Sequence, residues 1–167
     1  MYDYIHYDSP LGTLTIAAEH DALTALVIEG QKYEDQHLAG AGRERETPVL
    51  REAKLWLDRY FAGQRPDPAD LKLSPKGTAF QQRVWRALLN IPDGRTESFG
   101  ALAARLGSSA RAVGSAVGRN PISVIIPCHR VVGADGSLCG YAGGLENKEK
   151  LLSLEGIHVD KERGKLN

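Results

Sequence analysis

The sequence is poor in the residues that build disulfide frameworks, metal centres and membrane spans. Its 167 residues include only two cysteines, one methionine and two tryptophans. Two cysteines cannot form a cysteine-rich zinc site, and none of the five histidines has a metal-ligand spacing to them. No apolar run approaches the length of a transmembrane helix, and the N-terminus lacks the basic-then-apolar pattern of a signal peptide. These absences predict a cytoplasmic protein with free thiols, no metal and no membrane partner.

An excess of either charge is missing overall, since 21 basic residues balance 21 acidic ones. The two kinds of residue are nevertheless unevenly distributed along the chain. Residues 1–75 carry 13 acidic and eight basic residues, whereas residues 76–130 carry two acidic and eight basic residues, seven of them arginine. Arginine suits bidentate phosphate contacts, so a basic block of this kind indicates a polyanionic partner, with nucleic acid first. A solvated basic surface would account for the same composition.

The first half of the chain has the pattern of a small β-rich domain. Residues 2–29 alternate polar and apolar residues between turn signals and predict an antiparallel meander. Residues 30–46 are polar and predict a loop. A helix is expected over residues 48–61, with Thr47 as N-cap and a proline in the first helical position. Residues 64–75 read as a linker, which divides the chain into domains at 1–75 and 76–167.

The second half predicts helices. Thr78 and Gln81 have capping-box spacing at the start of a helix that ends near residue 91. Two short helices follow, capped by Ser98 and Ser109, with a three-residue glycine-containing turn between them, as in a helix-turn-helix. A last helix is expected over residues 147–155. The predicted fold class is α/β (α+β): an N-terminal β-rich domain packed on a mostly helical C-terminal domain with a winged-helix-like helix-turn-helix.

Chemistry concentrates in Val124–Val132, where two apolar β-branched runs flank Pro127, Cys128, His129 and Arg130. A cysteine in such surroundings most often behaves as a small buried hydrophobe. Neighbouring positive charge can instead lower its pKa and make it a nucleophile. The tetrapeptide alone leaves both interpretations open.

Glu155 supplies a second clue, because helical geometry places it on the apolar stripe of Leu151 and Leu152. A buried carboxylate requires a partner, and His129 is the natural candidate. The alternative is that Glu155 lies at a frayed helix end in water.

The second half of the chain, from Gly77 to Gly156, closely resembles the O6-alkylguanine-DNA alkyltransferases, and residues 1–75 match that family's smaller N-terminal domain only in general character. The motifs that carry the resemblance occur in order: Phe80-Gln81, Val84-Trp85, Ile91-Pro92, Arg111-Ala112-Val113-Gly114, Asn120-Pro121-Ile122, Pro127-Cys128-His129-Arg130, Gly140-Tyr141-Ala142-Gly143-Gly144-Leu145 and Glu155-Gly156.

The resemblance implies a catalytic set in which Cys128 accepts the alkyl group. His129 and Glu155 complete a Cys-His-Glu relay with a water on the thiol side, and Asn120 braces the turn. For substrate binding it implies Tyr141, Ala142, Val131 and Phe99. For DNA binding it implies Arg111, which fills the space left by the extruded base, together with Ser98, Ala112, Gly114, Arg119 and Arg130.

The implied function is direct reversal of DNA damage. One alkyl group would move irreversibly from O6-alkylguanine, with O4-alkylthymine as a second candidate, to the protein after base flipping in duplex DNA. The implied partner is double-stranded DNA with alkylated bases, bound without a cofactor by a protein that is monomeric in solution; cooperativity on DNA stays open. Two alternatives are a non-catalytic lesion binder, against which Cys128 argues, and a Cys-His-Glu thiol hydrolase.

Three departures from the family pattern have consequences. Phe99 stands where the family usually has tyrosine, which predicts weaker or slower action on duplex DNA. The turn at residues 107–109 is about two residues shorter than usual, which affects the reach of Arg111. The zinc ligands of some members' N-terminal domains are missing.

Overall fold

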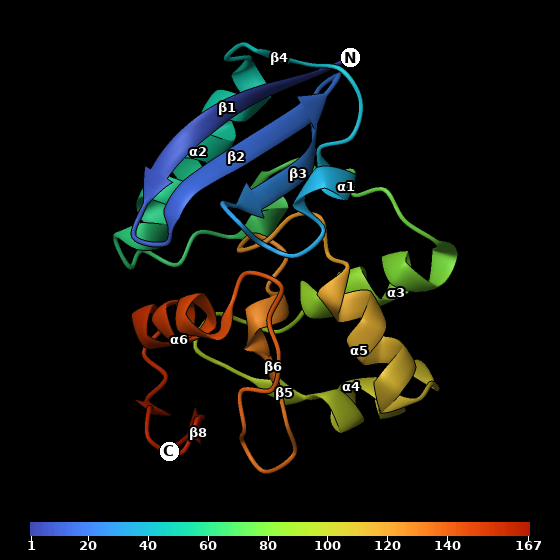
Figure 1. The fold of residues 1–167 in the computed structure, drawn as a ribbon, viewed down its shortest axis with the longest axis vertical. Coiled ribbons are helices and arrows are strands. Elements are labelled where there is room, and N and C mark those ends of the chain that lie inside the picture. The colour runs from blue at the N-terminus through green and yellow to red at the C-terminus, as the bar shows by residue number, and fades with distance from the viewer. The chain divides into compact units, whose positions relative to one another are not determined.

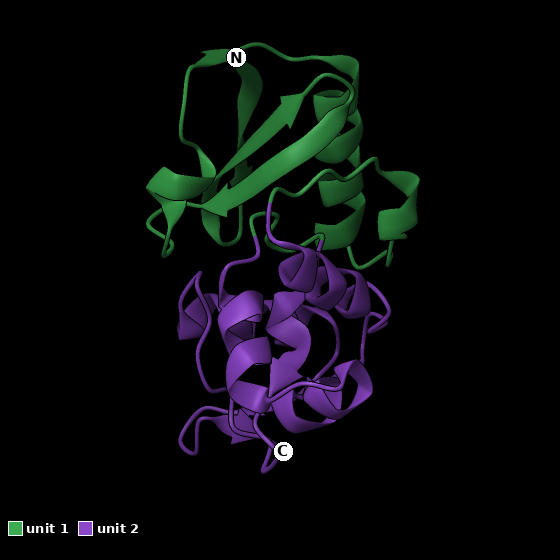
Figure 2. Ribbon diagram, turned by 90° about the vertical axis from the view of Figure 1, so that its right-hand side faces the viewer, with its two compact units in different colours: residues 1–76, 121–125 green, residues 77–120, 126–167 purple.

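The computed structural model describes residues 1–167 and divides the chain into two units (Figure 2). Unit 1 comprises residues 1–76 and 121–125, and unit 2 comprises residues 77–120 and 126–167. The chain therefore leaves unit 1, builds three helices of unit 2, and returns to unit 1 for five residues before entering unit 2 again. The sequence pattern does not indicate this return.

Unit 1 is built on a four-stranded sheet with the strand order β3-β2-β1-β4 (Figure 1). Its strands are β1 (Tyr2–Ser9), β2 (Gly12–Glu19), β3 (Ala22–Ile28) and β4 (Gly42–Glu44). The first three form the predicted antiparallel meander, and β4 pairs parallel to β1. Side chains on the inner face of β2 and β3 are fully buried, because alternate residues of a strand point to the same face. They include Leu14, Ile16, Leu26 and Ile28.

Helix α2 (Pro48–Phe61) packs against β1, β2 and β3 and covers one face of the sheet (Figure 1). The helix has the bounds predicted from its apolar stripe, with Leu50 and Leu57 fully buried. Thr47 occupies the N-cap, but its side chain makes no capping hydrogen bond. The proline at the first helical position removes one of the N–H groups that would need such a bond.

The segment predicted as a loop over residues 30–46 contains a short helix, α1 (Glu34–His37), and the edge strand β4. All three residues of β4 are exposed, so the strand leaves no alternation of polar and apolar residues in the sequence. Its pairing with β1 is supported by an ion pair of 2.9 Å between Arg43 and Asp3. Gly42 lies against the ring of Tyr2, where a Cβ atom would fall 2.4 Å from a ring carbon. The absence of a side chain permits this contact. The linker region adds the short helix η1 (Pro68–Asp70).

Unit 2 begins with three helices that pack on one another: α3 (Ala79–Leu88), α4 (Phe99–Leu106) and α5 (Ala110–Gly118). The predicted capping box of Thr78 and Gln81 is present, with both reciprocal hydrogen bonds. Ser98 and Ser109 cap α4 and α5, and Gly107 ends α4 with a φ of 63°. The helix-turn-helix prediction is confirmed.

The remainder of unit 2 carries short elements around the Cys128 stretch (Figure 1). They are β5 (Glu97–Ser98), the 3-10 helix η2 (Cys128–Arg130), β6 (Val131–Val132), α6 (Leu145–Leu154), β7 (Val159–Asp160) and β8 (Lys165–Leu166). Strands β5 and β6 pair in parallel, and α6 packs against η2. The last helix thus begins two residues earlier than predicted, and Glu155 is its C-cap. No helix of the chain is both long enough and apolar enough to cross a membrane.

Candidate functional site

Cys128 opens η2 directly after Pro127, with only 4% of its surface exposed. Its backbone N–H donates to the carbonyl of Ile126 at 2.8 Å. The same carbonyl accepts a hydrogen bond of 2.8 Å from Nδ2 of Asn120, which is itself buried. The turn that presents the thiol is therefore held by the side chain of Asn120, which follows the C-cap of α5.

Next to the thiol, His129 and Glu155 form a buried pair. Nε2 of His129 lies 2.7 Å from Oε2 of Glu155, and the side chains are 0% and 1% exposed. Glu155 is therefore not in water at a frayed helix end, and the expected contact with His129 is present. Because a carboxylate can only accept, Nε2 is assigned as the donor, and Nδ1 is left with a lone pair. Nδ1 is buried and has no hydrogen-bond partner in the protein.

The electrostatics of the pair keep the carboxylate charged and the imidazole neutral. Although burial raises it, hydrogen bonds from His129 and Arg130 and the positive charge of Arg130 lower the pKa of Glu155 to about 2. Burial lowers the pKa of His129 below its ordinary value, and Glu155 counteracts only part of that effect. At neutral pH the ring is thus a neutral base with an acceptor nitrogen available.

Arg130 requires a correction, because the sequence analysis placed it among the DNA contacts. Its side chain is 7% exposed, with Nε at 2.8 Å from Oε1 of Glu155 and Nη2 at 3.0 Å from Oε2. Nη1 donates to the carbonyl of Ile91 at 2.7 Å, and Nη2 lies 3.7 Å from Asp93. A guanidinium that is buried and bound in this way cannot reach a phosphate. We therefore assign Arg130 to the interior of the site, where it holds Glu155.

The Cys128 thiol also differs from the expectation that its neighbours depress its pKa. Burial raises the pKa of Cys128, and hydrogen bonds with Asn120 and Tyr141 together with the charge of Lys148 offset only part of that rise. His129 is neutral, and the charge of Arg130 is compensated by Glu155, so neither supplies the positive field that the tetrapeptide suggested. The resting group is a thiol, and reaction requires a base.

The glycine-rich loop brings Tyr141 to the same place. Its ring is edge-on to the His129 ring, with 6.5 Å between the centroids, and its side chain is close enough to Cys128 to lower the pKa of the thiol. Ala142 follows in the same half-buried stretch. Val131 is fully buried, so only its backbone could face a ligand, and its carbonyl accepts a hydrogen bond from Lys148.

Sequence reasoning missed Lys148, which is the least expected member of the site. The side chain extends from α6, is fully buried, and donates to the carbonyls of Val131, Leu138 and Gly140. A signal was available, because Lys148, Leu151, Leu152 and Glu155 follow the spacing of one helical face. Lysine is rarely buried without a partner, which makes the position notable.

The helix pair presents a different surface. Arg111 and Arg119 are exposed at the start and end of α5, and Arg111 has no ion pair. Of the two predicted DNA contacts, Ser98 caps α4 by accepting a hydrogen bond from the backbone of Ala101. The N–H of Ala112 donates to Ser109, the cap of α5. Gly114 is half-buried, and a Cβ there would meet the Phe99 ring at 3.8 Å, an ordinary contact distance.

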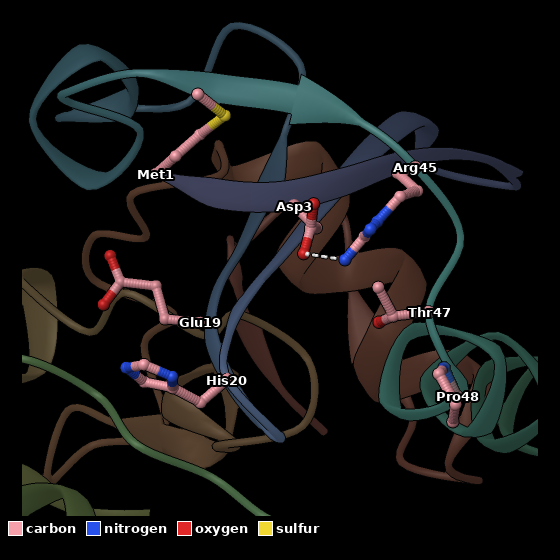
Figure 3. A pocket seen from close by; sticks show the side chains of 7 residues that line it. All are labelled: Met1, Asp3, Glu19, His20, Arg45, Thr47 and Pro48. Atoms are coloured by element: carbon pink, nitrogen blue, oxygen red, sulfur yellow. Dashed lines mark hydrogen bonds and ion pairs between the residues drawn. The ribbon is translucent and has the colours of Figure 1, made fainter.

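Unit 1 contains a hollow of about 510 Å³, and none of the predicted site residues lines it (Figure 3). It is lined by Met1, Asp3, Glu19, His20, Arg45, Thr47 and Pro48. Asp3 binds Arg45 at 3.2 Å, and Glu19 binds Lys76 at 2.8 Å, so its acids are already paired. No group of three or more His, Cys, Asp or Glu side chains in the chain is arranged to hold a metal ion.

Two family models match the chain. Residues 79–157 match the model of the 6-O-methylguanine DNA methyltransferase DNA binding domain, and residues 2–75 match that of the ribonuclease-like domain of the same family. The chain belongs to the 6-O-methylguanine DNA methyltransferase family. Both models together cover most of its length, including the N-terminal half that the sequence motifs matched only in general character.

Relatives of this methyltransferase family are similar over nearly the whole chain. A methylated-DNA–protein-cysteine methyltransferase from Mycolicibacterium paratuberculosis is 44% identical over 95% of this chain and 94% of its own. The constitutive enzyme of that name from Bacillus subtilis is 45% identical over 92% and 95%. The crystal structure of Mycobacterium tuberculosis OGT in complex with DNA superimposes with a TM-score of 0.83, at 45% identity, over 92% of this chain and 93% of that one. The predicted fold class and family are confirmed.

Proposed function

We propose that this protein repairs O6-alkylguanine in duplex DNA by transferring the alkyl group to Sγ of Cys128, once per molecule. The observation that carries the proposal is the buried His129–Glu155 pair directly beside the only buried cysteine of the chain. Membership of the methyltransferase family supports it, because relatives at 44% and 45% identity are named for transfer from methylated DNA to a protein cysteine.

The chemistry is a displacement at an alkyl carbon. His129, oriented by Glu155 and kept neutral by burial, takes the thiol proton through Nδ1, directly or by way of a water. The thiolate forms a new S–C bond while the C–O6 bond breaks, and its electron pair remains on the guanine. The departing guanine takes up one proton, which balances the proton lost by Cys128. A thioether cannot be cleaved by the groups present, so the reaction ends after one turnover.

The remaining residues would bind the lesion. A target inside a duplex must be flipped out of the stack, at a cost of about a few kcal/mol. Arg111, exposed on α5, would occupy the vacated space, and Arg119 would contact phosphate. Tyr141 lies within hydrogen-bond reach of Cys128 and could donate to the purine, where stabilisation of a developing anion is needed. The backbone near Ala142 and Val131 and the ring of Phe99 would line the base pocket.

Label transfer tests this proposal directly. Duplex DNA with radiolabelled O6-methylguanine should transfer up to one equivalent of label to the protein, and mass spectrometry should locate it on Cys128. Cys128→Ala should abolish transfer, and Cys139→Ser, which changes the exposed cysteine, should leave it intact. Label that stays on DNA would indicate a lesion binder. More than one equivalent, or esterase activity without DNA, would indicate a thiol hydrolase, and either result would refute the proposal.

We also infer that the protein acts in the cytoplasm and as a monomer. Free thiols such as Cys128 and Cys139 persist in reducing compartments, and the alkyl acceptor must remain reduced to react. Each chain carries its own candidate thiol, base and DNA-facing helix, so the proposed reaction needs no second copy. Sedimentation with and without DNA would test both the monomer and its cooperativity on DNA.

A further inference from the structure

The last residues of unit 2 form a hairpin that the sequence pattern does not indicate. Strands β7 and β8 pair in antiparallel fashion close to the C-terminus, with Val159 opposite Leu166 (Figure 1). The Asp160 carboxylate closes the turn between them by accepting from the N–H groups of Glu162 and Arg163, at 3.1 Å and 3.2 Å. An isolated hairpin is marginally stable at best, so contacts with the rest of unit 2 must hold it.

The outer edge of β8 pairs with the segment that leads into the glycine-rich loop (residues 139–144). The N–H of Leu166 donates to the carbonyl of Gly136 at 2.8 Å, and the N–H of Leu138 donates to the carbonyl of Gly164 at 3.0 Å. The residues between these two hydrogen bonds form an antiparallel bridge. The segment therefore acts as a third strand beside the hairpin.

Apolar side chains join the same segments. Leu138 forms a buried cluster with Leu152 of α6 and Val159 of β7, and Ile157 and Leu166 pack against it. Burial of these side chains stabilises the pairing, because it removes apolar surface from water. Leu166 therefore supports the segment in two ways, through its backbone N–H and through its side chain.

Leu138 is held on both sides of its backbone. Its N–H is bound by the hairpin, and its carbonyl accepts a hydrogen bond of 2.5 Å from Nζ of Lys148. Tyr141 follows in the loop, and its own carbonyl accepts from the N–H of Gly144 at 2.9 Å, directly before α6 begins at Leu145. The loop is thus fixed at its end by α6 and at its start by Leu138. The position of Leu138 therefore decides where Tyr141 lies.

We propose that Leu166 is a positioning residue for lesion binding, which holds Leu138 and thereby keeps Tyr141 in place beside His129. The inference rests on the proposed function, because the base that Tyr141 would meet is the proposed substrate. The Tyr141 ring lies edge-on to the His129 ring, with 6.5 Å between the centroids, so a shift of the loop would displace it from the site. Alkylation of Cys128 by a small reagent needs no contact with a purine. It should therefore depend on β8 far less than transfer from guanine does.

The test compares Leu166→Pro, which removes the N–H that donates to Gly136, with Lys161→Pro as the matched control. Lys161 lies in the turn of the same hairpin, at a position where proline is favoured and where the N–H donates no hydrogen bond. The ion pair of Lys161 with Glu149 involves an exposed ammonium and contributes little. The control thus introduces the same residue into the hairpin without breaking its contact with the segment before the loop.

Methyl transfer is measured from O6-methylguanine in duplex DNA and from the free base, and iodoacetamide alkylation of Cys128 is followed by mass spectrometry, which distinguishes it from Cys139. Leu166→Pro should slow transfer from both guanine substrates about tenfold, since displacing a positioning group by about 1 Å costs up to about a hundredfold in rate. Its alkylation by iodoacetamide should not slow to that extent, and Lys161→Pro should match wild type in all three reactions. Equal losses in transfer and alkylation, or no loss in either, would overturn the proposal.

A double-mutant cycle tests whether Leu166 acts through Tyr141. Tyr141→Phe removes the hydroxyl that would donate to the purine. If the hairpin serves to place that hydroxyl, the losses from Leu166→Pro and Tyr141→Phe should overlap, and the double variant should transfer faster than the product of the two losses predicts. Losses that multiply would refute a role through Tyr141.

A second variant and hydrogen exchange make the test independent of folding and of the proposed function. Leu166→Ala retains the N–H and removes only the side chain, so it should show the same pattern with a smaller loss. Without DNA, amide exchange across residues 139–144 should rise in Leu166→Pro and stay unchanged in Lys161→Pro. Unchanged exchange in both variants would overturn the proposal. If the wild-type protein transferred no methyl group, the proposed function would fail, while the exchange rates would still decide whether Leu166 holds the loop.

Discussion

Oε1 and Oε2 of Glu155 are both held by Arg130, at 2.8 Å and 3.0 Å, while Oε2 also accepts from His129 at 2.7 Å. One carboxylate therefore orients the base beside Cys128 and is itself fixed by a buried guanidinium. The arrangement explains why the arginine next to the candidate thiol is not available to DNA. It also makes the charge state of Glu155 important for both stability and reactivity.

The first prediction concerns acid stability. Glu155 has a pKa of about 2 in the folded protein against 4.5 for the ordinary group, so its contribution is complete above pH 4.5 and is lost as the pH falls toward 2. The linked stabilisation is about 3 kcal/mol. Urea unfolding of wild type and Glu155→Gln at a series of pH values should show a difference in the free energy of unfolding that narrows below pH 4.5. A difference in the free energy of unfolding that does not depend on pH would contradict the assignment of Glu155 as a charged and paired group.

Asn120 is predicted to act through the turn that it braces. Asn120→Ala removes the hydrogen bond to Ile126 and one of the interactions that lower the pKa of Cys128. The Cys128 pKa should therefore rise further, and methyl transfer should slow. The loss in stability should be about 0.5–1.5 kcal/mol for one hydrogen bond, because the Ile126 carbonyl keeps its bond from the Cys128 N–H. Iodoacetamide titration and urea unfolding measure both effects. Asn90→Ala, at an exposed position, is the control and should change neither.

Variants at Arg130 and Arg119 are predicted to differ in how strongly their DNA affinity depends on salt concentration. Arg130→Met leaves Glu155 buried without its guanidinium, and should cost about 3–5 kcal/mol of stability. It should not change the slope of DNA affinity against salt, because the side chain reaches no phosphate. Arg119→Met, at an exposed position, should reduce that slope by about one and leave stability nearly unchanged. Equal slopes for wild type and Arg119→Met would remove Arg119 from the DNA contacts.

Arg111 is predicted to matter only where a base must be extruded. Arg111→Ala should slow methyl transfer from duplex DNA more than transfer from the free O6-methylguanine base, because the free base needs no flipping. The side chain is exposed and has no ion pair, so stability should be unaffected. Single-turnover rates on both substrates give the comparison. Equal losses on the two substrates would exclude the role in base replacement.

Much of the fold could be predicted because local rules decide it. The bounds of α2 follow from a proline at the first helical position and a continuous apolar stripe, and the caps of α3, α4 and α5 follow from side chains three residues before a backbone donor. Strand β4 could not be predicted, because all its residues are exposed and leave no alternation of polar and apolar residues in the sequence.

Site residues could be predicted where helical periodicity fixes the face on which a side chain lies. They could not be predicted where the geometry of a turn decides the direction of the side chain. Glu155 lies on the stripe of α6, and its contact with His129 follows from the cost of burying a charge. Arg130 could be placed only by the geometry of η2, which aims it inward toward Ile91 and Glu155. Lys148 shares the stripe of Glu155, but a long flexible side chain does not reveal which carbonyls it will reach.

The return of residues 121–125 to unit 1 has a consequence for how the chain folds. Leu26 of β3 donates to the carbonyl of Pro121 and accepts from the N–H of Ser123, so this short segment covers the outer edge of the sheet. An uncovered edge strand is a template for pairing with other chains. Lys72 and Ser74 pair with Leu23 at the start of β3, but around Leu26 the edge stays open during synthesis until residue 125 has left the ribosome. A fragment ending at residue 76 should therefore aggregate.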